Sequence, residues 1–183
     1  MYVSESPSDL CRMLRLDPDV EQIELMERMA RARGYFDVAQ RDEASGEVDG
    51  GVLRAACMVL LWRTLRVPGS RGIVLGPPGP DGVAAGEQAH LAMEFILEVC
   101  KTKDAVLSSI SSVRGWHSVQ FGSEEGWEVR FVHSVPSIVA ESARRSLTAL
   151  VLDAGNARTS LSDAQKELEG LAREPRGLIL RLW

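Results

Sequence analysis

The chain has 183 residues, of which 45% are hydrophobic and only 5% aromatic, a composition typical of a single soluble α/β domain. The net charge of −5 argues against a dedicated nucleic-acid binder, because contacts to phosphates need clustered cations. No stretch approaches the roughly 18 uncharged apolar residues of a membrane span, and the opening residues MYVSESPSDL lack the pattern of a signal peptide. We therefore expect one cytoplasmic domain over residues 1–183.

The first third of the chain predicts a helix, a strand and a second helix. Residues 17–33 begin with Asp-Pro-Asp and then carry apolar residues at helical spacing, whereas residues 1–20 allow for a flexible N-terminal extension. Residues 35–40 are a short strand candidate. After the polar loop RDEASGEVDGG, the nearly all-apolar residues 52–66 predict a helix at the centre of the core.

The rest of the chain alternates between strands and helices. The run RGIVL is continuously apolar, as expected of a parallel strand covered on both faces. The remaining predicted elements are an amphipathic helix (87–100), a hairpin with strands HSVQF and WEVRFVHSV, a buried strand (147–153), a helix (160–172) and a last strand LILRLW. This order predicts an α/β fold of three layers, α/β/α, around a mostly parallel sheet with a β-hairpin insertion.

Cysteine and histidine residues give no sign of a metal site. Cys11, Cys57 and Cys100 are odd in number, far apart and without metal-ligand spacing, so we expect buried or inert thiols. The three histidines are scattered over a predicted helix and the two hairpin strands. We therefore expect no bound metal.

The strand LTALVLD ends on a carboxylate, Asp153. Four or five apolar residues followed by Asp form the Walker B strand of ATPases, in which the carboxylate sits at the sheet edge where Mg²⁺ and phosphates bind. In hydrolytic enzymes of this type the next residue is a glutamate that polarises the attacking water, but here it is Ala154, which accepts no proton. A core strand that ends on an acid at a loop is the alternative interpretation.

Two glycine-containing loops compete as the phosphate loop, or Walker A loop. Such a loop cradles phosphate with consecutive backbone N–H groups, neutralises it with a lysine and holds Mg²⁺ with a hydroxyl. In GPPGPDGV (76–83) three prolines remove N–H groups, and Gly82 and Val83 occupy the lysine and hydroxyl positions. We interpret this segment as a plain turn.

The second loop, SGEVDGGV (45–52), precedes the long apolar helix, as a Walker A loop does. Its candidate phosphate-binding residues are Gly46, Gly50 and Gly51, together with Arg41. The lysine and hydroxyl positions hold Gly51 and Val52, and Glu47 and Asp49 add negative charge. Arg41 or Arg54 could replace the lysine, but the missing hydroxyl and the nearby acids argue against a working site.

Most of the chain, from about Gln22 to Trp183, resembles the N-terminal ATPase domain of phage large terminases, the motors that package DNA. The matching segments are the upstream Gln22, VPGSRGIVLGPP with Gln88-Ala89, WEVRFV, ARRSLTALVLDAGNA and EPRGLILRLW. The resemblance implies a P-loop NTPase fold, although the nuclease domain of that family is absent from this sequence. A weaker resemblance to AAA-type ATPases fails at the same two places, the phosphate loop and the residue after Asp153.

The sequence departs from the terminase pattern at the positions that carry out its chemistry, since the lysine, the hydroxyl and the catalytic glutamate are all replaced. The sequence therefore favours a catalytically inactive relative that acts through protein interaction or assembly. The expected partner is an unidentified protein, for which a phage-derived protein is one candidate. No cofactor is expected under this hypothesis. The alternative is an active NTPase of a DNA-packaging or DNA-translocating motor, in which Asp153 would bind Mg²⁺ with ATP. The net charge gives no support to a nucleic-acid partner, and formation of an oligomer is a further possibility.

Overall fold

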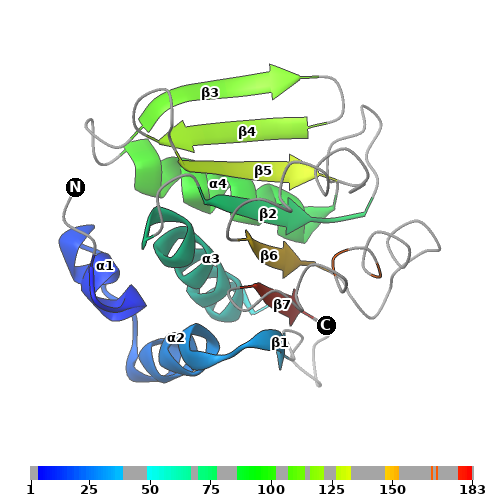
Figure 1. Ribbon diagram of the computed structural model, residues 1–183. Helices are drawn as coiled ribbons and strands as arrows, with labels where there is room; N and C mark the ends of the chain where they lie inside the picture. Colours follow the sequence, from blue (N-terminus) through cyan, green and yellow to red (C-terminus); the bar gives the residue numbers. More distant parts are fainter. Residues whose placement is uncertain are drawn as a thin grey trace.

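The computed structural model describes residues 4–38, 49–66, 70–77, 86–101, 107–113, 116–121, 127–132, 147–152, 166, 168 and 177–182 (Figure 1). Four helices and seven strands lie within these residues. The helices are α1 (Pro7–Met13), α2 (Val20–Arg31), α3 (Gly50–Arg66) and α4 (Glu87–Lys101). The strands are β1 (Gly34–Val38), β2 (Arg71–Leu75), β3 (Leu107–Val113), β4 (Trp116–Phe121), β5 (Trp127–Val132), β6 (Leu147–Val151) and β7 (Leu178–Leu182).

All seven strands form one sheet in the order β1-β7-β6-β2-β5-β4-β3. The five strands β1, β7, β6, β2 and β5 run parallel to one another, whereas β4 pairs antiparallel with both β5 and β3. The expected mostly parallel α/β sheet is therefore present, and the predicted hairpin β4-β5 extends it. Strand β3, which the sequence analysis did not predict, adds a third antiparallel strand at that end.

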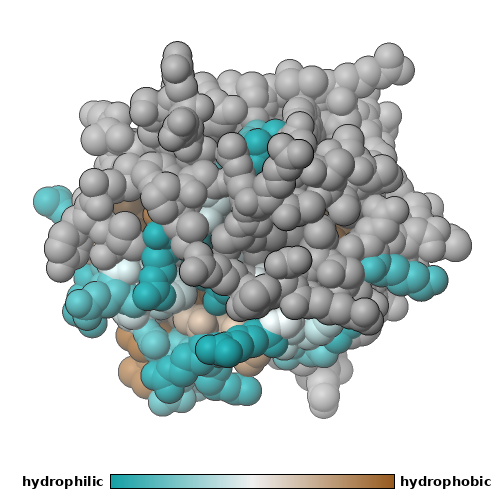
Figure 2. All heavy atoms as spheres, viewed as in Figure 1, coloured by the Kyte–Doolittle hydropathy of each residue, from teal (hydrophilic) through white to brown (hydrophobic). Residues whose placement is uncertain are grey.

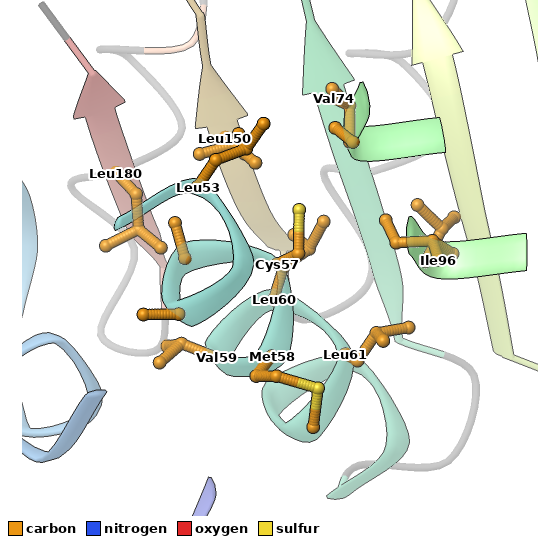
Figure 3. Close-up of a cluster of buried hydrophobic side chains, with 14 of the residues drawn as sticks. Leu53, Cys57, Met58, Val59, Leu60, Leu61, Val74, Ile96, Leu150 and Leu180 are labelled. Atoms are coloured by element: carbon orange, nitrogen blue, oxygen red, sulfur yellow. The ribbon is translucent and has the colours of Figure 1, made fainter. Parts of the chain in front are cut away.

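Helix α3 packs against strands β2, β5 and β6, and the other three helices pack around α3 or each other (Figure 1). Its side chains Leu53 and Leu60 belong to the same buried cluster as Leu150 of β6 and Leu180 of β7 (Figure 3). Because neighbouring elements surround it, α3 has almost no polar face, which explains its nearly all-apolar sequence. The predicted central helix is thus confirmed.

Both faces of the sheet are covered at its central strand β2. Successive residues of a strand point to opposite faces, and Ile73, Val74 and Leu75 of β2 are all fully buried. Within the predicted helix 160–172 only Lys166 and Leu168 are described; both are helical, and Leu168 is buried. These observations agree with the expected layers on both faces of the sheet.

The N-terminal segment is part of the core. Ser6 caps α1 by accepting a hydrogen bond from the backbone N–H of Asp9 at 3.1 Å, and Pro7 occupies the first turn, as is favoured at helix starts. Cys11 is only 1% exposed, and the indole Nε1 of Trp62 donates to the carbonyl of Ser4 at 3.0 Å. Residues 4–20, for which the sequence allowed a flexible extension, thus include a capped helix and contacts to α3, whereas residues 1–3 lie outside the described residues.

The surface over α1 and α2 is mainly hydrophilic, with smaller hydrophobic patches between the charged residues (Figure 2). The exposed large hydrophobic side chains among the described residues are Met13, Val20, Tyr35 and Leu91, which come from four different elements or their flanks. Scattered exposure of this kind is normal for a protein surface. No described helix is long and apolar enough to cross a membrane.

Candidate functional site at the start of α3

The first turn of α3 lies where the sequence predicts a phosphate loop. In a parallel βαβ unit the helix begins at the carboxyl end of the preceding strand, which is the edge of the sheet where α/β proteins bind ligands. Helix α3 follows β1 and leads to the parallel strand β2, with β7 and β6 between them in the sheet. It begins at Gly50, two residues before the predicted start, so Gly50 and Gly51 belong to the helix.

Asp49 caps this helix. One carboxylate oxygen, Oδ1, accepts hydrogen bonds from the backbone N–H groups of Gly51 at 2.8 Å and Val52 at 3.3 Å. The backbone carbonyl of Asp49 accepts the next one, from Leu53, at 3.2 Å. Unsatisfied N–H groups and the helix dipole make a helix N-terminus an anion site. In α3 the anion at this end is supplied by the protein's own side chain.

The side chain of Gln22, on α2, lies beside the first turn of α3. A Cβ added to Gly51 would meet the amide nitrogen Nε2 of Gln22 at 2.7 Å and Oδ1 of Asp49 at 3.1 Å. The Gln22 side chain also accepts from the backbone N–H of Asp19 at 3.3 Å, while Asp19 accepts from the Gln22 backbone at 2.8 Å, a reciprocal cap of α2. A longer side chain at position 51 would therefore displace Gln22.

The other residues of the predicted phosphate loop are only partly described. Gly50 has open space where a Cβ would lie, so this position tolerates a side chain. Arg41 and Gly46 lie outside the described residues. Arg54, considered as a substitute for the lysine, holds its guanidinium carbon 5.9 Å from the ring centroid of Phe95 on α4. Its charge is thus placed against α4.

The Walker B-like strand is confirmed as a strand, but the residues that end it are not described. Strand β6 is buried between β7 and β2, and the backbone N–H of Leu152 donates to the carbonyl of Leu75 at 2.9 Å. Asp153 and Ala154 come next and lie outside the described residues, as do residues 78–85 of the proline-rich loop. Their predicted roles stay predictions.

The described thiols are buried, as the sequence analysis expected for Cys11 and Cys57. Burial raises the pKa of Cys11 to about 11 and that of Cys57 to about 12. A thiol with a raised pKa is a poor nucleophile and metal ligand at neutral pH. No group of three or more His, Cys, Asp or Glu side chains within the described ranges is arranged to hold a metal ion.

The capping role of Asp49 has a signal in the sequence. Aspartate directly before a helical segment is a preferred N-cap, and reading it so would have started the helix at Gly50. The contact between Gln22 and Gly51 has no such signal, because it depends on how α2 packs on α3.

Comparisons with known proteins bear on the fold alone. No protein-family model matches the chain, and no curated protein does. Among solved structures, it is similar to the large terminase ATPase domain of Thermus phage P74-26, with a TM-score of 0.54 and 15% sequence identity, over 97% of this chain and 70% of that one. A single-residue mutant of the same domain gives the same score and identity over 99% of this chain and 70% of that one. The fold predicted from the terminase resemblance is confirmed.

Proposed function

We propose that this chain is a terminase-type ATPase scaffold that does not turn over nucleotide and acts through protein interaction or assembly. The observation that carries the proposal is the first turn of α3, where the Asp49 carboxylate accepts the N–H groups of Gly51 and Val52. In a working phosphate loop these N–H groups and a lysine would face phosphate oxygens. Gly51 and Val52 supply neither the ammonium group nor the hydroxyl.

Electrostatics supports the same conclusion. Two unit charges 4 Å apart interact with about 1 kcal/mol in water and about 4 kcal/mol at the effective dielectric of a protein surface. A phosphate at this helix end would meet repulsion from Asp49, which is solvent-exposed, so the lower figure is the closer one. The repulsion applies to each phosphate charge near the carboxylate, and no lysine at position 51 offsets it.

The experiment is an isothermal titration of the purified protein with ATP and with a non-hydrolysable analogue, each with and without Mg²⁺. We expect no heat of binding up to millimolar nucleotide. Binding tighter than about 100 μM, or about 5.5 kcal/mol, would show that a phosphate site survives and would contradict the proposal. A Mg²⁺-dependent ATPase rate that Asp153→Ala abolishes would establish the active NTPase instead.

A further inference from the structure

Helices α2 and α3 end side by side, at the end of the sheet opposite the first turn of α3. Figure 3 shows α3 running from the arrowheads of the strands toward their starts. Gln22 of α2 lies beside Gly51 at the first turn of α3, and the carbonyl of Ala30 accepts from Nη1 of Arg63 at 3.4 Å near its last turn. The two helices therefore run in the same direction, and their last turns meet.

These last turns carry an arginine cluster, which consists of Arg28, Arg31, Arg33, Arg63 and Arg66. Four of the five residues are exposed, whereas Arg63 is half-buried and donates to Thr148 Oγ1 at 3.3 Å. Burial, together with the positive charge of Arg66, lowers the pKa of Arg63. The neighbouring cation thus adds to the positive potential around Arg63.

Carboxylates offset only part of this charge. Glu24 and Glu27 of α2 lie within one turn of the cluster, and Glu27 pairs with Arg31 at 3.7 Å. Five arginines and two glutamates leave a charge of +3. Since the whole chain carries −5, the rest of it carries −8. The arginine cluster is therefore a positive patch on an otherwise acidic protein.

The helix dipoles do not account for the whole patch. The C-terminus of a helix carries about half a negative charge, so two helix ends together offset about one arginine. About +2 remains. Arg28 and Arg66 lie over the rings of Phe36 and Trp62, at 5.8 and 5.1 Å from their centroids. These contacts hold the two guanidinium groups in place without neutralising their charge.

The extent of the patch fits a short acidic segment better than a nucleic-acid duplex. The axes of two packed helices lie about 8–10 Å apart, which an extended chain spans with about three residues. A duplex carries one charge per about 1.7 Å along its whole length, so it would also run past the acidic remainder of the surface. Carboxylates match the fork of an arginine with two parallel hydrogen bonds.

We propose that the arginine cluster binds an acidic segment of a protein partner, whose Asp and Glu side chains contact Arg28, Arg33 and Arg66. The inference rests on the proposed function, protein interaction, and names the kind of partner. The arginine cluster and the first turn of α3 lie at opposite ends of that helix. A failed peptide titration and a positive ATP titration are therefore separate outcomes.

The test uses the full chain and a fluorescently labelled peptide that alternates glutamate and glycine, with fluorescence anisotropy as the readout. The matched peptide has glutamine in place of each glutamate. We expect the glutamate peptide to bind at low ionic strength and to be released as salt is added, and the glutamine peptide not to bind. No binding of the glutamate peptide, or equal binding of both peptides, would overturn the proposal.

Two double variants of equal charge locate the binding surface. Arg33→Glu with Arg66→Glu reverses two exposed cations of the cluster, and we expect the glutamate peptide to bind about tenfold or more weakly. The control is Arg12→Glu with Arg15→Glu, in the last turn of α1 and the segment that leads to α2. It changes the net charge equally and should leave the affinity unchanged. Equal losses in both would assign binding to net charge and contradict the proposal.

A conservative variant and a second ligand complete the test. Arg33→Lys with Arg66→Lys keeps both charges and removes only the fork of donors, so it should fold as the wild type does and bind the glutamate peptide several-fold more weakly. Unchanged affinity would reject the paired contacts to carboxylates. A duplex DNA oligonucleotide that bound more tightly than the glutamate peptide would show a nucleic-acid surface and overturn the proposal.

Discussion

Asp49 offers the most direct test of how the first turn of α3 is closed. Its Oδ1 atom accepts N–H groups at 2.8 and 3.3 Å, so Asp49→Ala leaves two N–H groups to water and removes the N-cap. Loss of an N-cap aspartate costs about 1 kcal/mol of unfolding free energy. For a domain of this size the melting temperature should fall by about 2–4 °C.

Two further substitutions divide this effect into its parts. Asp49→Asn keeps an acceptor oxygen and loses only the charge, so we expect a smaller loss, about 0.3–1 kcal/mol at low ionic strength, that shrinks as salt is added. Asp49→Gly should cost only a few tenths of a kcal/mol, because glycine is tolerated at the N-cap. None of the three variants should gain ATP binding, since positions 51 and 52 still lack a lysine and a hydroxyl.

The assay is urea unfolding followed by tryptophan fluorescence, at low and at high salt, for the wild type and the three variants. The expected order of stability is aspartate, asparagine or glycine, and then alanine. If Asp49→Ala were as stable as the wild type, within about 0.3 kcal/mol, Asp49 would not be the cap in solution. Its carboxylate would then not occupy the anion position at the start of α3.

Two other predictions concern the core. A Cβ on Gly72 would lie 2.8 Å from Thr64 Oγ1 and 3.2 Å from a methyl carbon of Leu60, so Gly72→Ala should lower the unfolding free energy by about 1–3 kcal/mol in the same urea assay. The control Gly50→Ala should not destabilise the protein, because the space around Gly50 is open. An unchanged stability of Gly72→Ala would show that α3 can move off the sheet. Burial raises the pKa of Cys57 from 9.0 to about 12, so above pH 9 the unfolded chain loses the thiol proton first and the unfolding free energy falls as the pH rises toward 12. In Cys57→Ala the unfolding free energy should fall less steeply with pH. Equal slopes in the variant and the wild type would show that the Cys57 thiol does not have this raised pKa.

Strongly patterned elements could be predicted from the sequence nearly to the residue. The continuous apolar run of β2 and the amphipathic pattern of α4 need no tertiary information, and both elements lie where expected. Strand β3 was missed because its sequence, LSSISSV, has four serines and weak strand propensity. It is held by pairing with β4, which no local pattern reveals.

The sequence also does not reveal which charged side chains are buried. The alternating sequence WEVRFV predicts a strand but does not show that its charged face is covered. In the structure Glu128 and Arg130 are 6% and 7% exposed, and Glu128 forms ion pairs with Arg71 at 2.9 Å and Arg130 at 2.8 Å. Buried carboxylates and guanidinium groups are stable only when paired in this way. The partner Arg71 comes from β2, so the pairing depends on the strand order.

For the candidate site, too, some features could be predicted from the sequence and others could not. The composition of its loop, without lysine or hydroxyl at the two expected positions, was visible in the sequence and motivated the inactive interpretation. The position of Gln22 against Gly51 was not, because it requires the packing of α2 on α3. Local chemistry is thus readable from residue types, whereas contacts between elements need the fold.

The place of β7 in the sheet has a consequence for how the chain folds. β7 lies between β1 and β6, and its Arg181 pairs with Asp37 of β1 although the two are 144 residues apart in sequence. Until β7 arrives, β1 has no neighbour among the described strands and β6 has only β2. Closing so long a loop costs entropy before any contact repays it, so folding should be slow. During synthesis on the ribosome, both hydrogen-bonding edges of β1 would stay unpaired until residues 178–182 emerge. In that interval β1 is most liable to pair with the wrong strand or with another chain.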